Sequence, residues 1–172
     1  MEILEFEKID STQKKAIELI KKKKFKPWTV ILAKEQTAGI GRKGNFWYAP
    51  KGGLYFSVIL PQTKIEDVEI LTNLAAFLVA KIIFKKFGQK PFIKFPNDVY
   101  LRNKKVCGIL TQNIVFGKKI ISVMGIGVNT NIEKFPPNLK RKATSLFLEF
   151  KKKIQNKKLL KEILQQLKKV LK

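Results

Sequence analysis

Residues 39–44 combine three glycines with two cations in the order Gly-Ile-Gly-Arg-Lys-Gly. This order satisfies G-x-G-x-x-G, which binds a pyrophosphate when it opens a helix. Here residues 45–53 continue as a loop into a strand, so we reject a dinucleotide-binding turn. A long glycine-rich loop with arginine and lysine can still bind phosphate groups through backbone N–H groups and positive charge. A basic connection between two strands is the other interpretation.

The remaining reactive side chains exclude several kinds of site. The chain has no histidine and one cysteine, Cys107. An internal disulfide needs two cysteines, and a histidine-based metal site or catalytic triad needs histidine. Any reaction must therefore use lysine, arginine, carboxylate, amide and hydroxyl groups. Cys107 lies in an apolar run and is expected to be a buried small residue.

The net charge of +23 comes from 36 basic and 13 acidic residues. Only Arg42, Arg102 and Arg141 are arginines, so lysine dominates, and the lysines are spread along the whole chain. The lysine ammonium group is a point charge and lacks the planar, bidentate hydrogen-bond donors with which arginine recognises bases. Two interpretations stay open, a lysine-rich solvated surface and a functional patch for a polyanion.

The length and hydropathy predict one globular domain. The 172 residues suit a single domain, here residues 1–172, and 45% of them are hydrophobic. The apolar run 74–80 ends at Lys81, far short of the roughly 20 residues that a spanning helix needs. The first ten residues carry three glutamates where a signal peptide would be basic. We therefore expect a cytoplasmic chain without a membrane segment.

Three segments show helical spacing. Ser11 is a favoured N-cap and precedes a predicted helix of about 12 to 15 residues. Residues 66–87 are apolar almost all round and end before Gly88, so they predict a helix that lies in the core. Residues 159–171 predict a final amphipathic helix.

Strands are predicted between these helices. Their ranges are 28–33, 53–60, 92–95, 99–102, 106–115 and 118–128, with turns at 103–104 and 116–117. The last four strands follow one another as antiparallel hairpins. The order of elements predicts an α+β fold with helices packed on a mixed, mostly antiparallel sheet.

Five ordered motifs then carry a resemblance that spans about the whole chain. They are Ser11-Thr12-Gln13, the segment 36–47 (QTAGIGRKGNFW), 94–99 (KFPNDV), 104–110 (KKVCGIL) and 125–129 (GIGVN), followed by 143–146 (ATSL). Together they resemble the catalytic domain of biotin protein ligase, which has a class II synthetase-like fold. The resemblance implies that the chain forms biotinyl-5′-adenylate from biotin and ATP with Mg²⁺, and then biotinylates one lysine of a biotin carboxyl carrier domain.

The resemblance also implies the residues that bind biotin. Neutral donors and acceptors suit its ureido group, because a charged side chain would be costly in a dry pocket. Gly39 and Gly108 would let the backbone approach the ligand, and Trp47 would cover its apolar rings. The implied biotin site consists of Ser11, Thr12, Gln13, Gln36, Gly39, Ile40, Gly41, Arg42, Trp47, Lys105 and Gly108.

The implied catalytic residues are Arg42 and Lys105, which match the family's positions for neutralising charge between a carboxylate and a triphosphate. The implied ATP site consists of Arg42, Lys94, Asn97, Asp98 and Asn129. Asp98 would hold Mg²⁺ through water or position the ribose. No resident metal site is expected.

The chain departs from the family pattern at four positions. Ile40 stands where arginine is usual, Asn45 where a basic residue is common, Phe95 where tryptophan is usual and Gln112 where glutamate is expected. The loss of a loop arginine puts phosphate affinity in doubt. We also expect neither an N-terminal DNA-binding domain nor a C-terminal β domain, and therefore no repressor activity.

The expected partner is the biotin carboxyl carrier protein of a carboxylase. We expect no binding to specific DNA or to a membrane. The sequence leaves open whether the chain forms a homodimer. Two alternatives remain. A lipoate or octanoate transferase shares the architecture but needs a long apolar tunnel and a different glycine motif. A lysine-rich nucleic-acid-binding protein would explain the charge but would leave the polar motifs without a role.

Overall fold

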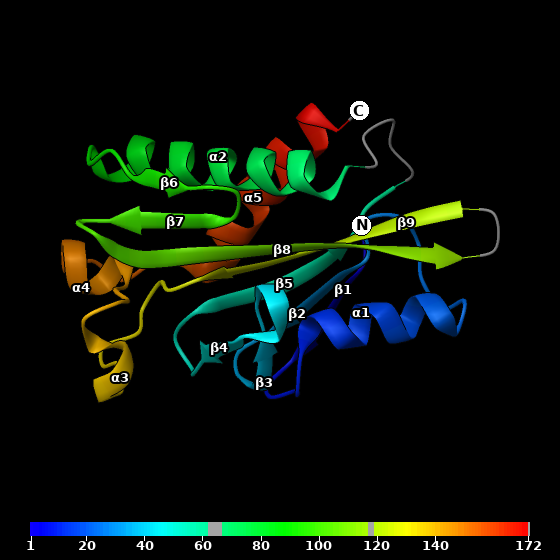
Figure 1. Ribbon diagram of the computed structural model, residues 1–172, viewed down its shortest axis with the longest axis horizontal. Helices are drawn as coiled ribbons and strands as arrows, with labels where there is room; N and C mark the ends of the chain where they lie inside the picture. Colours follow the sequence, from blue (N-terminus) through cyan, green and yellow to red (C-terminus); the bar gives the residue numbers. More distant parts are fainter. Residues whose placement is uncertain (62–66, 117–118, 172) are drawn as a thin grey trace.

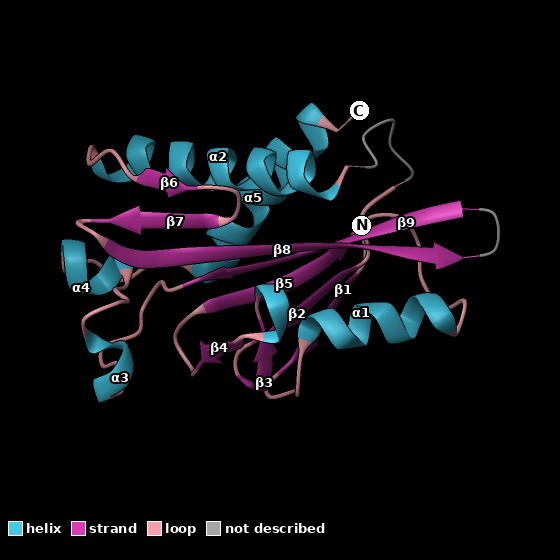
Figure 2. Cartoon of the chain, in the orientation of Figure 1, coloured by secondary structure: helices cyan, strands magenta, loops and turns pink. Residues whose placement is uncertain are grey.

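The computed structural model describes residues 1–61, 67–116 and 119–171. It combines helices and strands, and β8 and β9 are the longest strands (Figure 2). The elements in chain order are β1 (Ile3–Phe6), α1 (Thr12–Lys21), β2 (Val30–Ala33), β3 (Gln36–Ile40), a short 3-10 helix η1 (Arg42–Gly44), β4 (Phe46–Ala49), β5 (Leu54–Ile59), α2 (Val68–Phe87), β6 (Phe92–Lys94), β7 (Asp98–Leu101), β8 (Lys104–Phe116), β9 (Lys119–Val128), α3 (Pro137–Lys140), α4 (Leu146–Phe150) and α5 (Asn156–Val170).

Within the described ranges, seven strands form one sheet in the order β1-β2-β5-β9-β8-β7-β6. β1 and β2 are parallel, and the other neighbouring strands are antiparallel. In Figure 1, α2 runs along one side of this sheet, while α1 and the β3–β4 hairpin lie on the other. The predicted fold, α+β with a mixed and mostly antiparallel sheet, is confirmed.

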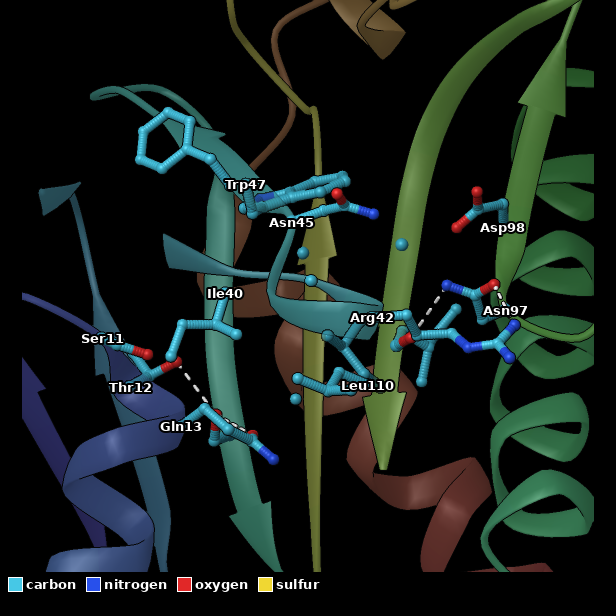
Figure 3. Close-up of a pocket in the computed structure, with 18 of the residues that line it drawn as sticks. Ser11, Thr12, Gln13, Ile40, Arg42, Asn45, Trp47, Asn97, Asp98 and Leu110 are labelled. Carbon is cyan, nitrogen blue, oxygen red and sulfur yellow. Dashed lines mark hydrogen bonds between the residues drawn. The ribbon is translucent and has the colours of Figure 1, made fainter. Parts of the chain in front are cut away.

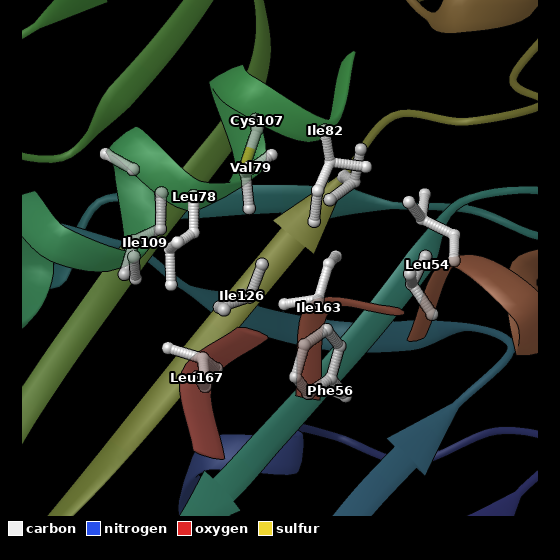
Figure 4. Close-up of a cluster of buried hydrophobic side chains, with 14 of the residues drawn as sticks. Leu54, Phe56, Leu78, Val79, Ile82, Cys107, Ile109, Ile126, Ile163 and Leu167 are labelled. Atoms are coloured by element: carbon white, nitrogen blue, oxygen red, sulfur yellow. The ribbon is translucent and has the colours of Figure 1, made fainter. Parts of the chain in front are cut away.

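One face of the sheet carries the main hydrophobic core. Alternate residues of β5 and β9, such as Phe56 and Ile126, point to this face and are almost completely buried. α2 and α5 cover them, with Val79 and Ile163 packed against the strands (Figure 4). Because a strand alternates its side chains between two faces, the intervening residues of the same strands must face the other side.

The opposite face is only partly covered. There Ala16 and Ile20 of α1 pack on Ile31, Ile59 and Val123 of the sheet and form a second, smaller cluster. Ser11 is the N-cap of α1, as predicted, and its side chain accepts from the backbone N–H of residue 14. α1 ends at Lys21 and contains 10 residues, fewer than the 12 to 15 predicted.

The segment predicted as a long glycine loop is mostly ordered as a hairpin, so that prediction was wrong. β3 and β4 pair antiparallel, Ile40 opposite Phe46, on either side of η1. Only residues 50–53 lead as a loop into β5. Short strands with a register shift between Gln36 and Gly39 break the regular alternation that sequence reasoning relies on.

The prediction that the second helix lies inside the core was also wrong in part. α2 begins at Val68 with Asp67 as its N-cap and ends at Phe87, followed by the C-cap Gly88, which has a left-handed φ of 71°. Its outward face exposes Ile70, Phe77 and Phe84 by 53%, 57% and 49%. Only the inner side of the helix meets the sheet and α5. Residue 66, included in the prediction, lies outside the described residues.

The strand predictions hold with small shifts at their ends. β2 starts at Val30 because Trp28 has a positive φ of 66°. The turn between β7 and β8 is centred on Arg102 and Asn103, both with positive φ, one residue earlier than predicted. The predicted turn at 116–117 and the predicted strand start at residue 118 include residues 117–118, which lie outside the described part of the chain. β1, α3 and α4 were not predicted.

None of the helices in the described ranges combines the length and the apolar character required to cross a membrane.

Candidate active site

A cavity of about 520 Å³ opens on the partly covered face of the sheet (Figure 3). α1, the β3–β4 hairpin and the strands β5, β7, β8 and β9 contribute to its wall. Most residues expected at the site line it, namely Ser11, Thr12, Gln13, Gln36, Ile40, Gly41, Arg42, Trp47, Lys94, Asn97, Asp98, Lys105 and Gly108. Gly39 and Asn129 do not belong to this lining.

The floor of the cavity consists of strand positions with small side chains. Ser57 of β5 is opposite Gly125 of β9, and Gly127 of β9 is opposite Gly108 of β8. Residues opposite each other in adjacent strands point to the same face of a sheet. The small residues therefore leave this part of the face hollow, whereas Val123, two residues earlier on β9, fills it under α1.

Trp47 lies directly on two of these glycines. A Cβ atom built on Gly108 would be 2.8 Å from Trp47 Cζ3, and one built on Gly127 would be 2.6 Å from Trp47 Nε1. Any side chain at either position would displace the indole ring. Gly108 therefore makes room for the indole ring of Trp47, and its expected close approach to a ligand stays a prediction.

Gly39 has a similar explanation and does not face the cavity. It pairs with Trp47 in the hairpin, and a Cβ atom there would be 2.5 Å from the Trp47 backbone oxygen. This glycine lets β4 come close, and its expected contact with biotin stays a prediction.

One end of the cavity is polar and uncharged. Ser11 and Thr12 start α1 and are buried, with 0% and 4% of their surfaces exposed. Gln36 Oε1 accepts a hydrogen bond from the Thr12 N–H at 2.8 Å and lies 3.1 Å from Thr12 Oγ1. Three neutral hydrogen-bonding side chains therefore meet where the start of α1 contacts β3.

Gln13 lines the same end, but its amide is used inside the protein. Its Nε2 donates to Gln112 Oε1 at 3.0 Å and to the Val123 carbonyl at 3.3 Å, and its Oε1 accepts from Ser57 Oγ at 2.9 Å. Ser57 Oγ is also 2.9 Å from Thr12 Oγ1. The amide at position 112, where the family pattern has glutamate, thus gives Gln13 a neutral partner.

The other end of the cavity is cationic. Lys105 Nζ is 2.7 Å from Asp98 Oδ1 and 5.1 Å from the centre of the Trp47 ring. Arg42 Nη1 donates to Asn97 Oδ1 at 3.2 Å. Both expected catalytic cations are thus held by the adjacent residues Asn97 and Asp98.

The loop before β7 is fixed to β8 by one backbone and one side-chain hydrogen bond of Asn97. The Ile109 N–H donates to the Asn97 carbonyl at 2.9 Å, and Asn97 Nδ2 donates to the Ile109 carbonyl at 3.3 Å. Lys94 of β6 is opposite Asp98 of β7, so the two side chains share a face. Lys94 is exposed and adds a further positive charge at this end.

Asn129 has a different place from the one expected. It is buried behind β8, where its Nδ2 donates to the Thr144 carbonyl at 3.0 Å and is 3.4 Å from the Lys105 carbonyl. Asn129 therefore holds the segment before α4 against the strand that carries Lys105. Its Oδ1 is buried and has no hydrogen-bond partner among the described residues, and the expected contact of Asn129 with ATP stays a prediction.

The described residues contain no group of three or more histidine, cysteine, aspartate or glutamate side chains that could hold a metal ion. Asp98 and Asn97 do supply one carboxylate and one amide oxygen to the cavity. Mg²⁺ bound to a nucleotide keeps several waters and takes only one or two protein ligands. These two residues therefore fit a magnesium ion that arrives with a triphosphate.

Cys107 takes no part in the site. It is completely buried on the core face of β8, and burial raises the pKa of its thiol far above the ordinary value. The thiol thus stays protonated and cannot act as a nucleophile. The prediction that Cys107 is a buried small residue is confirmed.

Sequence reasoning missed several lining residues, of which Ser57 and Gly125 have the largest consequences. A usable signal was present in the strand around Ser57. Leu54, Phe56 and Val58 alternate with Tyr55, Ser57 and Ile59, so a small hydroxyl residue interrupts the second series. Such an interruption indicates a hollow or a hydrogen-bonding position on that face.

The chain is similar in sequence and in structure to known proteins. The sequence pattern described as "Biotin/lipoate A/B protein ligase family" matches residues 5–131. The chain is 40% identical over 143 residues to the bifunctional ligase/repressor BirA of Bacillus spizizenii, covering 80% of this chain and 44% of that protein. It is 36% identical over 124 residues to the biotin–[acetyl-CoA-carboxylase] ligase of Paracoccus denitrificans, covering 70% and 51%.

Among solved structures, the biotin protein ligase from Aquifex aeolicus in complex with biotin and ATP is similar with a TM-score of 0.87 and 30% identity. The match covers 99% of this chain and 70% of that one. The chain thus spans about half or less of the length of the two curated relatives and about two thirds of the solved structure.

Proposed function

The chain belongs to the biotin/lipoate A/B protein ligase family, and from this premise we propose that it joins biotin to ATP and then transfers the biotinyl group to a lysine of a biotin carboxyl carrier domain. The observation that carries the proposal is one cavity with a neutral polar end at Ser11, Thr12 and Gln36 and a cationic end at Arg42 and Lys105. In this proposal residues 1–172 act as one catalytic unit.

The neutral end suits the ureido group of biotin. A ureido group has one carbonyl acceptor and two N–H donors, and no charge. Ser11, Thr12 and Gln36 offer hydroxyl and amide groups that match it without burying an unpaired ion. Trp47 lies on Gly108 and Gly127 next to Lys105 and offers an apolar surface to the rings.

The cationic end suits the first chemical step. A biotin carboxylate oxygen attacks the α-phosphorus of ATP, the bond from that phosphorus to the bridging oxygen breaks, and pyrophosphate leaves with the bonding electrons. Two anions must approach each other for this reaction. The guanidinium of Arg42 and the ammonium of Lys105 reduce their repulsion and stabilise charge that builds up in the transition state.

The second step needs no nucleophile from this chain. The ε-amine of the carrier lysine attacks the carbonyl carbon of the adenylate, an amide forms, AMP leaves, and the amine gives up a proton. This agrees with a chain that has no histidine and only a buried cysteine. The excess of lysine on this chain would also attract an acidic carrier domain.

ATP enters as its magnesium complex, and the ion would neutralise part of the triphosphate charge. Asn97 and Asp98 are the residues placed to meet it. Ile40 lines the cavity in the hairpin where relatives usually carry arginine. We expect weaker retention of the adenylate for that reason, because the hairpin offers Arg42 and Lys43 but no third cation.

The direct test incubates the protein with biotin, Mg-ATP and a biotin carboxyl carrier domain, and measures the mass of the carrier. The expected result is one biotinyl adduct on one lysine, which disappears when ATP is omitted. Replacing biotin with lipoate in a parallel sample tests the transferase alternative. A lipoyl adduct without a biotinyl adduct would contradict the proposal, and so would salt-sensitive DNA binding with no adduct of either kind.

A further inference from the structure

Ser57 lies at the centre of a buried hydrogen-bond network under the neutral end of the cavity. It is completely buried and its Oγ lies 2.9 Å from both Thr12 Oγ1 and Gln13 Oε1. Gln36 and Val123 complete the network at its two ends. The direction of each hydrogen bond follows from which atoms can only accept.

The Val123 carbonyl fixes the first direction. A carbonyl only accepts, so the Gln13 atom 3.3 Å from it must be the amide nitrogen. Gln13 Oε1 consequently faces Ser57, and this oxygen also only accepts. The single hydroxyl proton of Ser57 therefore points to Gln13 Oε1.

The direction of the Thr12 hydroxyl follows. With its proton committed to Gln13, Ser57 Oγ can only accept from Thr12 Oγ1 at 2.9 Å. The alternative acceptor, Gln36 Oε1, is farther away at 3.1 Å and already receives the Thr12 N–H at 2.8 Å. Sending the Thr12 proton to Gln36 would leave two hydroxyl oxygens 2.9 Å apart with no proton between them.

The network thereby sets what the neutral end offers to a ligand. Thr12 Oγ1 has used its proton and offers lone pairs, so it accepts. Gln36 has its oxygen turned toward Thr12, so its NH₂ group is left to donate. A ligand group with an N–H donor next to a carbonyl acceptor complements this arrangement.

Gly125 leaves the space that this network requires. A Cβ atom at that position would be 2.6 Å from Gln13 Oε1 and 3.3 Å from Ser57 Oγ. Even alanine would push the Gln13 amide away from the Ser57 hydroxyl. The glycine at the cavity floor thus serves the network beneath the ligand as well as the shape of the pocket.

We propose that Ser57 is a positioning and specificity-determining residue whose hydroxyl keeps Thr12 as a hydrogen-bond acceptor toward the ligand. This inference rests on the proposed function, because the ligand group that it selects is the ureido N–H. Without the Ser57 hydroxyl, the acceptor left for the Thr12 proton is Gln36 Oε1, which is farther away at 3.1 Å and already receives the Thr12 N–H. Thr12 is then held less firmly as an acceptor, and the cavity distinguishes a donor from an acceptor less well at that point.

The test compares Ser57→Ala, Ser57→Thr and Ser122→Ala with the wild type by calorimetric binding. Ser122 is the matched control, because it is a buried serine that donates to Asn113 on the core face of the same sheet. The ligands are biotin and its two carbamate analogues, in each of which one ureido N–H is replaced by oxygen. The oxygen offers lone pairs where the N–H offered a proton.

The wild type should prefer biotin over the carbamate that faces Thr12. Ser57→Ala should weaken biotin binding and reduce that preference, each by about tenfold, as expected for one hydrogen bond in a buried site. Ser57→Thr, which restores a hydroxyl, should recover most of the preference, and Ser122→Ala should keep it. A merely structural role for Ser57 would weaken both ligands equally.

Amide-proton exchange measured without ligand helps to distinguish a failure of the role of Ser57 from a failure of the proposed function. In the wild type the Gln13 side-chain amide protons should exchange slowly with solvent in NMR spectra, and in Ser57→Ala they should exchange at least about tenfold faster, as local opening becomes easier. An unchanged preference in Ser57→Ala, with tight wild-type binding of biotin, overturns the role of Ser57 alone. A wild type that does not bind biotin overturns the proposed function, even if the exchange result holds.

Discussion

The two faces of the central sheet are built from the same strands, but one face forms a packed core and the other forms a cavity. On β5, Phe56 points to the face under α2 and α5, while Ser57 points to the cavity. On β9, Ile126 and Gly127 divide in the same way. One face is filled with large apolar side chains, and the other is kept hollow by glycine and serine.

The comparison shows that the cavity depends on the filled face. Glycine in a strand loses packing and conformational entropy, so the row that includes Gly108, Gly125 and Gly127 stabilises the sheet poorly. Burial of large apolar side chains contributes roughly 1.5 to 3 kcal/mol each, which offsets this loss. A hollow polar face is therefore possible because a dry core covers the other side.

The largest expected effect comes from removing a large side chain from the packed face of the sheet. Phe56→Ala removes a ring that is 1% exposed. We expect the free energy of unfolding to fall by about 3 to 5 kcal/mol, as for other buried phenylalanines. Chemical denaturation monitored by circular dichroism measures this change. A loss below about 1 kcal/mol would contradict the assignment of stability to this face.

The next effect comes from the cationic end of the hollow face. Lys105→Ala should reduce kcat/KM for biotinylation by about 100-fold, or about 2.7 kcal/mol of transition-state stabilisation. The free energy of unfolding should change much less than in Phe56→Ala. Lys104→Ala is the control, since Lys104 is the neighbouring cation but does not line the cavity. Equal losses in both variants would mean that general positive charge, rather than Lys105, is responsible.

A smaller effect is expected from adding one methyl group to the hollow face. In Gly108→Ala the new Cβ would meet the Trp47 ring at 2.8 Å, so the indole must shift. We expect the Kd for biotin, measured by calorimetry, to rise about tenfold, or about 1.4 kcal/mol.

Gly88→Ala is the matched control for that substitution. Gly88 ends α2 with a φ of 71° and has no atom within 4 Å of an added Cβ among the described residues. This variant should lose about 1 kcal/mol of stability and keep its biotin affinity. A normal Kd in Gly108→Ala would show that Trp47 does not shape the pocket.

The smallest effect concerns the solvent side of α1, which belongs to neither face. Hydrogen bonds from Lys22 and Lys15 lower the pKa of Glu18 to about 2 from the ordinary 4.5. A lowered pKa stabilises the folded state above the unfolded value, and this contribution disappears as the pH falls from about 4.5 toward 2. Thermal melts at pH 6 and pH 3 should therefore show a slightly larger loss in the wild type than in Glu18→Gln.

Repeating the thermal melts at high salt tests whether the effect of Glu18 is electrostatic. At about 1 M salt the screening length is about 3 Å, so the exposed pairs of Glu18 should contribute almost nothing. A difference between wild type and Glu18→Gln that persists there would show that Glu18 stabilises α1 by something other than its charge.

Much of the fold could be predicted because its signals are local. The N-cap at Ser11, the stop at Gly88 and the four consecutive hairpin strands each depend on neighbouring residues in the chain. The β3–β4 hairpin was missed because glycines hide its short strands. The exposed side of α2 was missed because the apolar sequence of a helix does not indicate whether other elements cover one side of the helix or both.

Most of the expected site residues do line one cavity, and the exceptions share a cause. Gly39 and Asn129 lie in motifs that suggest ligand contact, but their neighbours in space are Trp47 and Thr144. Ser57 was omitted for the converse reason, since no motif marks it. A motif locates a segment near a site and leaves the direction of each side chain open.

The amino-acid sequence specifies the residue types, their alternation along strands and the chemistry that they allow: neutral hydroxyls and amides, many cations, no histidine. These properties depend on covalent identity and on the period of a strand or helix. Only the tertiary structure decided that Ser57, Gln13 and Thr12 share one network and that Trp47 rests on Gly108 and Gly127. Such contacts join residues 44 to 80 positions apart in the chain, and their geometry follows from strand register, which no local pattern specifies.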